Sequence, residues 1–206
     1  MLQTQTVEPR TLELLKRIDS IDELKTFRLV GGTALALQYG HRQSIDLDFF
    51  TDADFDNEKI LETVENEGNV IVLNKTAKIL QLSINGVKVD FVDYSRYKWL
   101  DEAIEENGVR LACDKDIAAM KVNAIMGRGT RKDFVDMFFL LKYYSLTEIL
   151  EFYKLKYPNF SEYRALLSMT FFEDAEKQVM PKMLCDCTWE EVCSTIITWV
   201  KKYQSY

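Results

Sequence analysis

Short apolar and alternating runs in the first half of the chain predict β-strands, whereas longer segments with an apolar residue every three to four positions predict helices. The predicted strands are Phe27–Val30, Ile45–Phe50, Val70–Leu73, Ile79–Ile84 and Val87–Val92. The predicted helices of this half are Thr11–Asp22, Thr33–Tyr39 and Asn57–Glu67, the last with Asp54 or Asp56 as its N-cap. Asn85-Gly86 between two strand-like runs is a strong hairpin signal, so at least one strand pair is antiparallel.

The second half of the chain has a helical pattern throughout. Asp114–Met126 and Arg131–Tyr144 are predicted helices separated by a glycine-containing turn, and capping boxes at Ser145 and Thr188 begin two more. We therefore expect an α+β protein. Its N-terminal α/β domain with a mixed sheet would span residues 1–112, and its C-terminal helical domain would span residues 113–206.

Composition excludes some classes of function. The chain has 206 residues, of which 47% are hydrophobic, so a substantial core is available. The net charge of −7 argues against a broadly basic surface for nucleic acid, although residues 114–132 carry a local positive excess that could grip phosphates.

Targeting and redox signals point to the cytoplasm. No apolar run approaches the roughly 20 residues that cross a bilayer, and no secretory signal is visible at the N-terminus, so we expect no membrane association. Without an export signal, the four cysteines are expected to be free thiols.

Two aspartates in the second predicted strand carry the strongest chemical signal. Asp46 and Asp48 stand two residues apart, so on a strand they point to one face, while Ile45, Leu47 and Phe49 turn toward the core. Two carboxylates on one face repel each other unless a cation lies between them, and Mg²⁺ suits oxygen ligands. The pattern therefore predicts a metal site.

A third acid would make this pair a catalytic centre that can hold two metal ions. In Val87–Asp93, the alternation turns Asp90 away from the buried positions, so Asp90 joins the pair if the two strands are neighbours. Asp93 is the competing candidate, because a register slip of one residue changes the face.

A turn beside these acids is a candidate phosphate site. Gly31, Gly32 and Thr33 join a strand to a helix, and backbone N–H groups at a helix N-terminus bind anions. The structural alternative is an ordinary turn with Thr33 as N-cap. Arg42 and Ser44, just before the acidic strand, are further candidates for contact with a triphosphate.

These motifs together resemble a known family. Gly32-Thr33, then Asp46-x-Asp48, then a later lone acid is similar to the DNA polymerase β-type nucleotidyltransferase superfamily. The order of Asp, Ala, Lys, Ala, Arg and Asp residues in 116–136 resembles the AbiEii-type nucleotidyltransferase toxins of bacterial abortive-infection systems. Thr33 in place of the usual Ser and Lys132 in place of the common Arg are departures that remove no catalytic group.

The resemblance implies roles for individual residues. Asp46, Asp48 and Asp90 would bind metal, with Asp90 as the third acid and the base, and Gly32 and Thr33 would hold the triphosphate. Lys121 would contact nucleotide phosphate and Asp136 would complete the site. From the residues alone, an ion pair between Lys121 and Asp133 or Asp136 explains this lysine equally well.

The expected function is a Mg²⁺-dependent nucleotidyltransferase, with Mn²⁺ as an alternative metal. It would transfer a nucleoside monophosphate from an NTP to an acceptor hydroxyl. The resemblance implies tRNA or another cellular RNA as acceptor, and a toxin role checked by a separately encoded antitoxin. The alternatives are a nucleotidyltransferase acting on a small molecule or protein, and a non-catalytic NTP-binding module.

Overall fold

The protein consists of two compact units, Met1–Cys113 and Asp114–Tyr206, and each is described here by itself. The structure is a computed structural model that describes residues 1–159 and 161–205. A mixed sheet with helices makes up the first unit, and the described part of the second is built from helices. The predicted α+β class is confirmed.

A seven-stranded mixed sheet organises the first unit. The strands run β1 (Arg28–Leu29), β2 (Leu47–Thr51), β3 (Val70–Lys75), β4 (Ile79–Ile84), β5 (Val87–Asp93), β6 (Ile104–Glu106) and β7 (Val109–Leu111). Their order across the sheet is β3-β4-β5-β2-β1-β7-β6. The β2–β5 and β1–β7 pairs are parallel and the other neighbours are antiparallel, so strands distant in sequence meet at the centre of the sheet.

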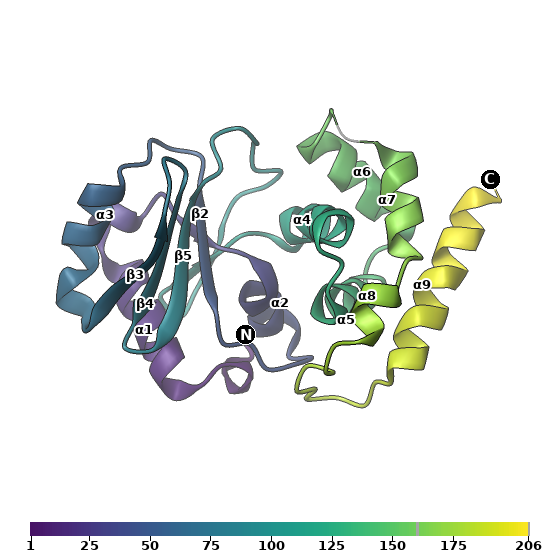
Figure 1. Ribbon diagram of the computed structural model, residues 1–206, viewed down its shortest axis with the longest axis horizontal. Helices are drawn as coiled ribbons and strands as arrows, with labels where there is room; N and C mark the ends of the chain where they lie inside the picture. The colour runs from purple at the N-terminus through teal and green to yellow at the C-terminus, as the bar shows by residue number, and fades with distance from the viewer. Residues whose placement is uncertain (160, 206) are drawn as a thin grey trace. The chain divides into compact units, whose positions relative to one another are not determined.

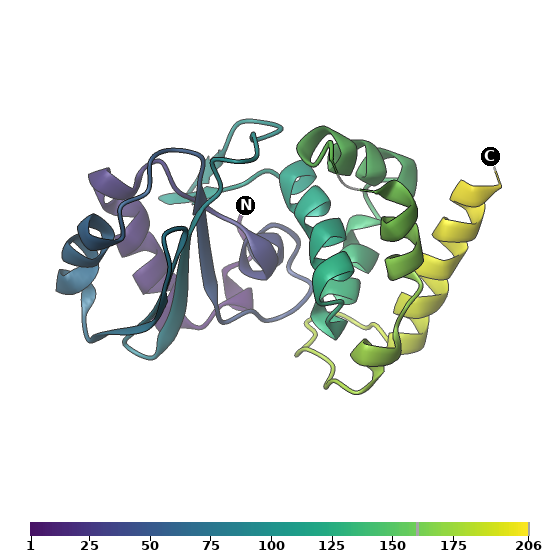
Figure 2. The ribbon, with the colours of Figure 1, turned by 45° about the horizontal axis from the view of Figure 1, so that its top comes forward.

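Helices cover both faces of this sheet. They are α1 (Pro9–Ser20), α2 (Gly31–Tyr39) and α3 (Asn57–Val64). Figures 1 and 2 show α1 and α3 on one face and α2 on the other. The core beneath α1 and α3 contains Phe27, Phe49 and Phe91, with the Phe49 and Phe91 rings stacked 5.5 Å apart. The opposite face of the same strands carries the acids.

The predicted elements of the first unit are present with shifted ends. Asp56 is the N-cap of α3, accepting hydrogen bonds from two backbone N–H groups. The prediction for Ile45 is wrong: β2 begins at Leu47, and the Ile45 side chain is 63% exposed rather than in the core. The chain before Leu47 has not yet joined the sheet, because Ser44 N–H donates to Thr6 O instead (2.9 Å).

Two hairpins in this unit have the same turn sequence. Asn85 and Gly86 both adopt positive φ angles, as the predicted tight turn requires. Asn107 and Gly108 do the same between β6 and β7, a hairpin that the sequence analysis missed. Its strands are only three residues long, too short to show alternation.

Six helices make up the described part of the second unit. They are α4 (Asp114–Gly127), α5 (Arg131–Leu140), α6 (Leu146–Lys156), α7 (Glu162–Met169), α8 (Glu173–Glu176) and α9 (Trp189–Gln204). Helix α4 packs against α5, α6 and α7, and α9 packs against the same three helices (Figure 2). The capping boxes at Ser145 and Thr188 are confirmed.

Helix α5 is shorter than predicted because the chain turns at residues 141–144 before the Ser145 cap begins α6. None of the described helices is long and apolar enough to cross a bilayer.

Candidate active site

Asp48 and Asp90 lie directly opposite each other at the centre of the sheet. In the parallel pair β2–β5, Asp48 is the register partner of Asp90, and Phe49 is the partner of Phe91. Partners in adjacent strands point to the same face, so the two carboxylates share one face and the two phenylalanines share the other. The pair stands on the face that carries α2.

Asp93 belongs to the opposite face. Its register partner is Thr51, three residues after Asp48, which places it on the side of Phe49 and Phe91. Lys78 Nζ lies 3.1 Å from its carboxylate, and Ser95 N–H donates to it at 2.8 Å. Of the two candidates for the third acid, the register favours Asp90.

The N-terminus of α2 lies against Asp48. Helix α2 begins at Gly31, with Gly32 as its second residue and Val30, not Thr33, as N-cap. Gly31 has φ +69°, and a Cβ atom there would lie 2.7 Å from Asp48 Oδ2. Glycine is therefore needed for both the backbone conformation and the close approach of the helix to the carboxylate. The N-cap residue Val30 provides no side-chain cap, and the positive end of the helix dipole faces Asp48.

Thr33 is buried, and its hydroxyl group contacts the loop before β2. Its Oγ1 atom lies 2.8 Å from Ser44 Oγ and donates to the backbone carbonyl of Asp46. These bonds hold the loop from which Asp46 projects, one residue before the strand that was predicted to carry it. In this structure Thr33 and Ser44 therefore position Asp46, and their contact with a triphosphate stays a prediction.

Arg42 also lies in this loop. Its side chain is buried, and Nη1 donates to the carbonyl oxygen of Gln43 at 3.0 Å. A buried guanidinium supports the loop from within the unit. Its predicted contact with a triphosphate remains a prediction.

The two oxygens of Asp90 have different surroundings. Oδ2 accepts hydrogen bonds from Gln81 Nε2 and Lys88 Nζ, each at 2.9 Å. Oδ1 is buried and has no hydrogen-bond partner among the described residues, and Asp90 as a whole is 9% exposed. Burying a carboxylate oxygen without a hydrogen-bond donor costs free energy, and such an oxygen is well suited to bind a cation.

Lys88 is a residue of the site that the sequence analysis missed. It precedes Asp90 by two residues on β5 and so stands on the same face. Burial lowers its pKa, but the hydrogen bond from Lys88 to Asp90 and the charges of Asp90, Asp48 and Asp46 outweigh burial and raise it. All three acids therefore act on one ammonium group. The rule that paired Asp46 with Asp48 would have found it.

The described residues provide some, but not all, of the ligands that a metal ion needs. Among the side chains of residues 1–159 and 161–205, no three His, Cys, Asp or Glu groups lie close enough together to hold a metal ion. Lys88 provides the positive charge at Asp90 instead. The facing pair Asp48 and Asp90, with the unpartnered Oδ1, nevertheless offers the hard oxygen ligands that Mg²⁺ prefers.

Lys121 and Asp136 lie in the second unit and form a buried ion cluster there. Lys121 Nζ lies 2.6 Å from Asp136 Oδ2 and 3.1 Å from Asp133 Oδ1, and all three side chains are at most 4% exposed. The structure thus shows the ion-pair alternative for Lys121. Its contact with nucleotide phosphate, and the catalytic role of Asp136, stay predictions.

Asp133 ties this cluster to the turn between α4 and α5. Arg128 donates to both of its carboxylate oxygens, at 2.9 and 3.0 Å, and the Thr130 hydroxyl donates to it as well. Burial raises the pKa of Asp133, but the charge of Lys121 and the bonds from Arg128 and Thr130 dominate and hold the pKa well below its usual range. Asp133 is therefore a charged structural anchor.

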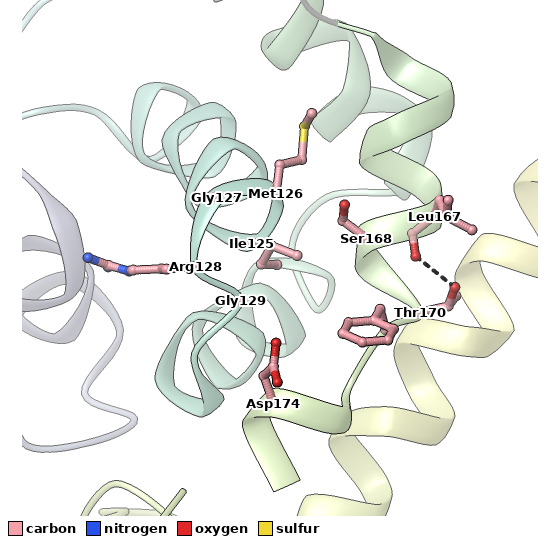
Figure 3. Close-up of a pocket in the computed structure, with 10 residues that line it drawn as sticks. Ile125, Met126, Gly127, Arg128, Gly129, Leu167, Ser168, Thr170 and Asp174 are labelled. Atoms are coloured by element: carbon pink, nitrogen blue, oxygen red, sulfur yellow. Dashed lines mark hydrogen bonds between the residues drawn. The ribbon is translucent and has the colours of Figure 1, made fainter. Parts of the chain in front are cut away.

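A pocket of about 600 Å³ lies in the second unit beside the same turn (Figure 3). Its wall combines apolar side chains from α4 and α7 with Ser168, Thr170 and Asp174, whereas Arg128 points away from it. The C-terminal end of α4 and the Asp174 carboxylate give the pocket negative character. None of the residues predicted for the active site lines it, and its charge does not suit a triphosphate.

Comparison with known proteins identifies a matching family and a relative. The family model described as nucleotidyl transferase AbiEii toxin, type IV toxin–antitoxin system, matches residues 13–110. The uncharacterized protein aq_aa25 of Aquifex aeolicus is 36% identical over 197 residues, which cover 93% of this chain and 94% of that protein.

Two solved structures share the fold at low identity. JHP933 from Helicobacter pylori has a TM-score of 0.56 at 17% identity, covering 97% of this chain and 95% of its own. The nucleotidyltransferase toxin MenT4 from Mycobacterium tuberculosis has a TM-score of 0.55 at 14% identity, covering 94% and 86%.

The class defined by this fold and these facing acids is that of the nucleotidyltransferases. Within this class, the chain belongs to the AbiEii nucleotidyltransferase toxin family. The resemblance seen in the sequence is confirmed.

Proposed function

We propose that this protein is a Mg²⁺-dependent nucleotidyltransferase that transfers a nucleoside monophosphate from an NTP to a hydroxyl group of RNA, with tRNA as the favoured acceptor. In this proposal it acts in the cytoplasm as the toxin of a toxin–antitoxin pair, and a separately encoded antitoxin checks it. Mn²⁺ would replace Mg²⁺ in vitro.

The observation that carries the proposal is the pairing of Asp48 with Asp90 beside the N-terminus of α2. Carboxylates provide metal ligands, and helix N–H groups bind phosphate oxygens. Their adjacency supports an NTP whose triphosphate lies between the two. The choice of RNA as acceptor comes from the resemblance to the AbiEii toxin family.

The chemistry assigns a task to each group. Asp46, Asp48 and Asp90 would hold Mg²⁺, which when bound offsets the charge of the triphosphate and makes the acceptor hydroxyl easier to deprotonate. The acceptor oxygen bonds to the α-phosphorus, the bond from that phosphorus to the bridging oxygen breaks, and pyrophosphate leaves. Asp90 accepts the proton of the hydroxyl, and the first N–H groups of α2 orient the phosphate oxygens.

Labelled NTPs and total bacterial RNA test the proposal directly. We expect label from one NTP to enter RNA in the presence of Mg²⁺. Asp48→Asn and Asp90→Asn should each lower the rate by about 10²-fold or more, because each removes charge from the reacting centre. Asp93→Asn is the matched control, since Asp93 stands on the other face of β5, and it should keep nearly full activity.

The alternatives give different outcomes in the same assay. Label that enters a small molecule or a protein but not RNA would still support a nucleotidyltransferase but would contradict RNA as its acceptor. NTP binding by calorimetry without transfer to any acceptor would favour the binding module. Equal activity of Asp90→Asn and the unmodified protein would remove Asp90 from the site.

A further inference from the structure

The ammonium group of Lys88 binds the carboxylate of Asp90, which the proposed function needs as a metal ligand. Its Nζ atom lies 2.9 Å from Asp90 Oδ2, and the side chain is 43% exposed. Asp48 is the register partner of Asp90, and the charges of Asp48 and Asp46 also act on Lys88. One ammonium thus offsets the mutual repulsion of the acids.

The two carboxylate oxygens of Asp90 differ in their hydrogen bonds. Oδ2 is held by Lys88 together with Gln81, the register partner of Asp90 on β4. Oδ1 is buried and has no partner among the described residues. Gln81 can fix the carboxylate by itself if the ammonium leaves, so Asp90 does not need Lys88 to keep its orientation.

We propose that Lys88 is a built-in counter-ion that competes with the divalent metal for the acid cluster. This inference rests on the proposed metal-dependent function. In the metal-free protein, the ammonium stabilises the cluster, and a metal ion must bind against its positive charge. Because its stem is flexible and its side chain is 43% exposed, Lys88 can move away from Asp90 toward anionic phosphate when metal and nucleotide arrive together.

The proposal predicts in which direction the loss of Lys88 changes the affinity for metal in the absence of nucleotide. If Lys88 competes, Lys88→Met should bind Mn²⁺ roughly three- to tenfold more tightly than the unmodified protein, because an opposing charge next to the ligands is gone. If Lys88 only orients Asp90, the same variant should bind Mn²⁺ more weakly. The measurement is Mn²⁺ titration without nucleotide, followed by the electron paramagnetic resonance signal of free Mn²⁺.

The chain offers matched controls. Lys78→Met removes a lysine that pairs with Asp93 at 3.1 Å on the other face of β5, so it should leave the Mn²⁺ affinity unchanged. Lys88→Arg keeps the positive charge and should stay within about twofold of the unmodified protein. Asp48→Asn should weaken binding and so locate the metal at this site. Circular dichroism of each variant checks that it is folded.

The outcomes separate this inference from the proposed function. Tighter Mn²⁺ binding in Lys88→Met alone supports the counter-ion role. Equal or weaker binding in that variant overturns it while the metal site stands. Absence of Mn²⁺ binding in the unmodified protein and in Lys88→Met, or binding that is unaffected by Asp48→Asn, overturns both the counter-ion role and the proposed metal site.

Discussion

At the scale of single residues, the site depends on one missing side chain. Gly31 combines a positive φ angle with a position where a Cβ atom would meet the carboxylate of Asp48. Gly86 also has a positive φ angle, but a Cβ atom there would meet nothing within 4 Å. The two glycines share a backbone requirement and differ only in their surroundings.

This difference gives a test of the close approach. Gly31→Ala and Gly86→Ala should each lower the free energy of unfolding by about 1 kcal/mol, because alanine disfavours positive φ. Only Gly31→Ala should also lower the transfer rate, by roughly tenfold or more, because its methyl group displaces the carboxylate of Asp48. Urea denaturation and the RNA labelling assay measure the two effects. Unchanged transfer in Gly31→Ala would contradict the assigned geometry.

The buried ion cluster around Lys121 shows what the sequence leaves undecided at the scale of single residues. The pattern around Lys121 allowed both a phosphate contact and an ion pair, and the structure shows ion pairs with Asp133 and Asp136. A buried lysine needs an anion, but the sequence does not state which anion is nearest.

At the scale of elements, the side chain of Asp19 links α1 to β7. Its Oδ2 atom accepts a hydrogen bond from Arg110 N–H at 3.1 Å. Burial raises the pKa of Asp19 to about 7, against the opposing effects of that N–H group and of the Arg110 charge. The carboxylate is thus less stable in the folded protein than in the unfolded chain.

The raised pKa fixes the sign of a pH effect. Between about pH 4 and pH 7, the folded protein keeps a proton on Asp19 that the unfolded chain has lost, so rising pH lowers the free energy of unfolding. Asp19→Asn keeps the acceptor oxygen and removes the titration. It should therefore be more stable than the unmodified protein at pH 8, by roughly 1–4 kcal/mol, but not at pH 4.

Urea unfolding at the two pH values measures this difference. Asp22→Asn is the control, because the pKa of the exposed Asp22 is lowered by its hydrogen bond with Lys25 and the variant should give a small change of opposite sign. A stability difference for Asp19→Asn that is the same at both pH values would contradict the prediction.

At the scale of the whole molecule, membership of a toxin family predicts an effect on cells. Expression of the unmodified protein in a bacterial culture should arrest growth, because the proposed transfer to RNA would stop that RNA from supporting translation. Asp48→Asn should restore growth, and Asp93→Asn should be as toxic as the unmodified protein. Growth curves with matched expression levels measure this effect. Arrest by Asp48→Asn at the same level would separate toxicity from nucleotidyl transfer.

Local chemistry made much of this protein readable from its sequence. The Asn85-Gly86 hairpin, the capping boxes at Ser145 and Thr188 and the α+β class follow from short-range steric and hydrogen-bond rules, and the ordered acid motifs indicated the family. These features depend on neighbours within a few residues.

Tertiary structure decided what local rules leave open. The parallel pairing of β2 with β5 brings Asp48 opposite Asp90 although 41 residues separate them in the sequence, and it places Asp93 on the other face. The exposure of Ile45 follows from where β2 joins the sheet. Strand order and the start of each ladder are set by the packing of the whole unit, so no local pattern contains them.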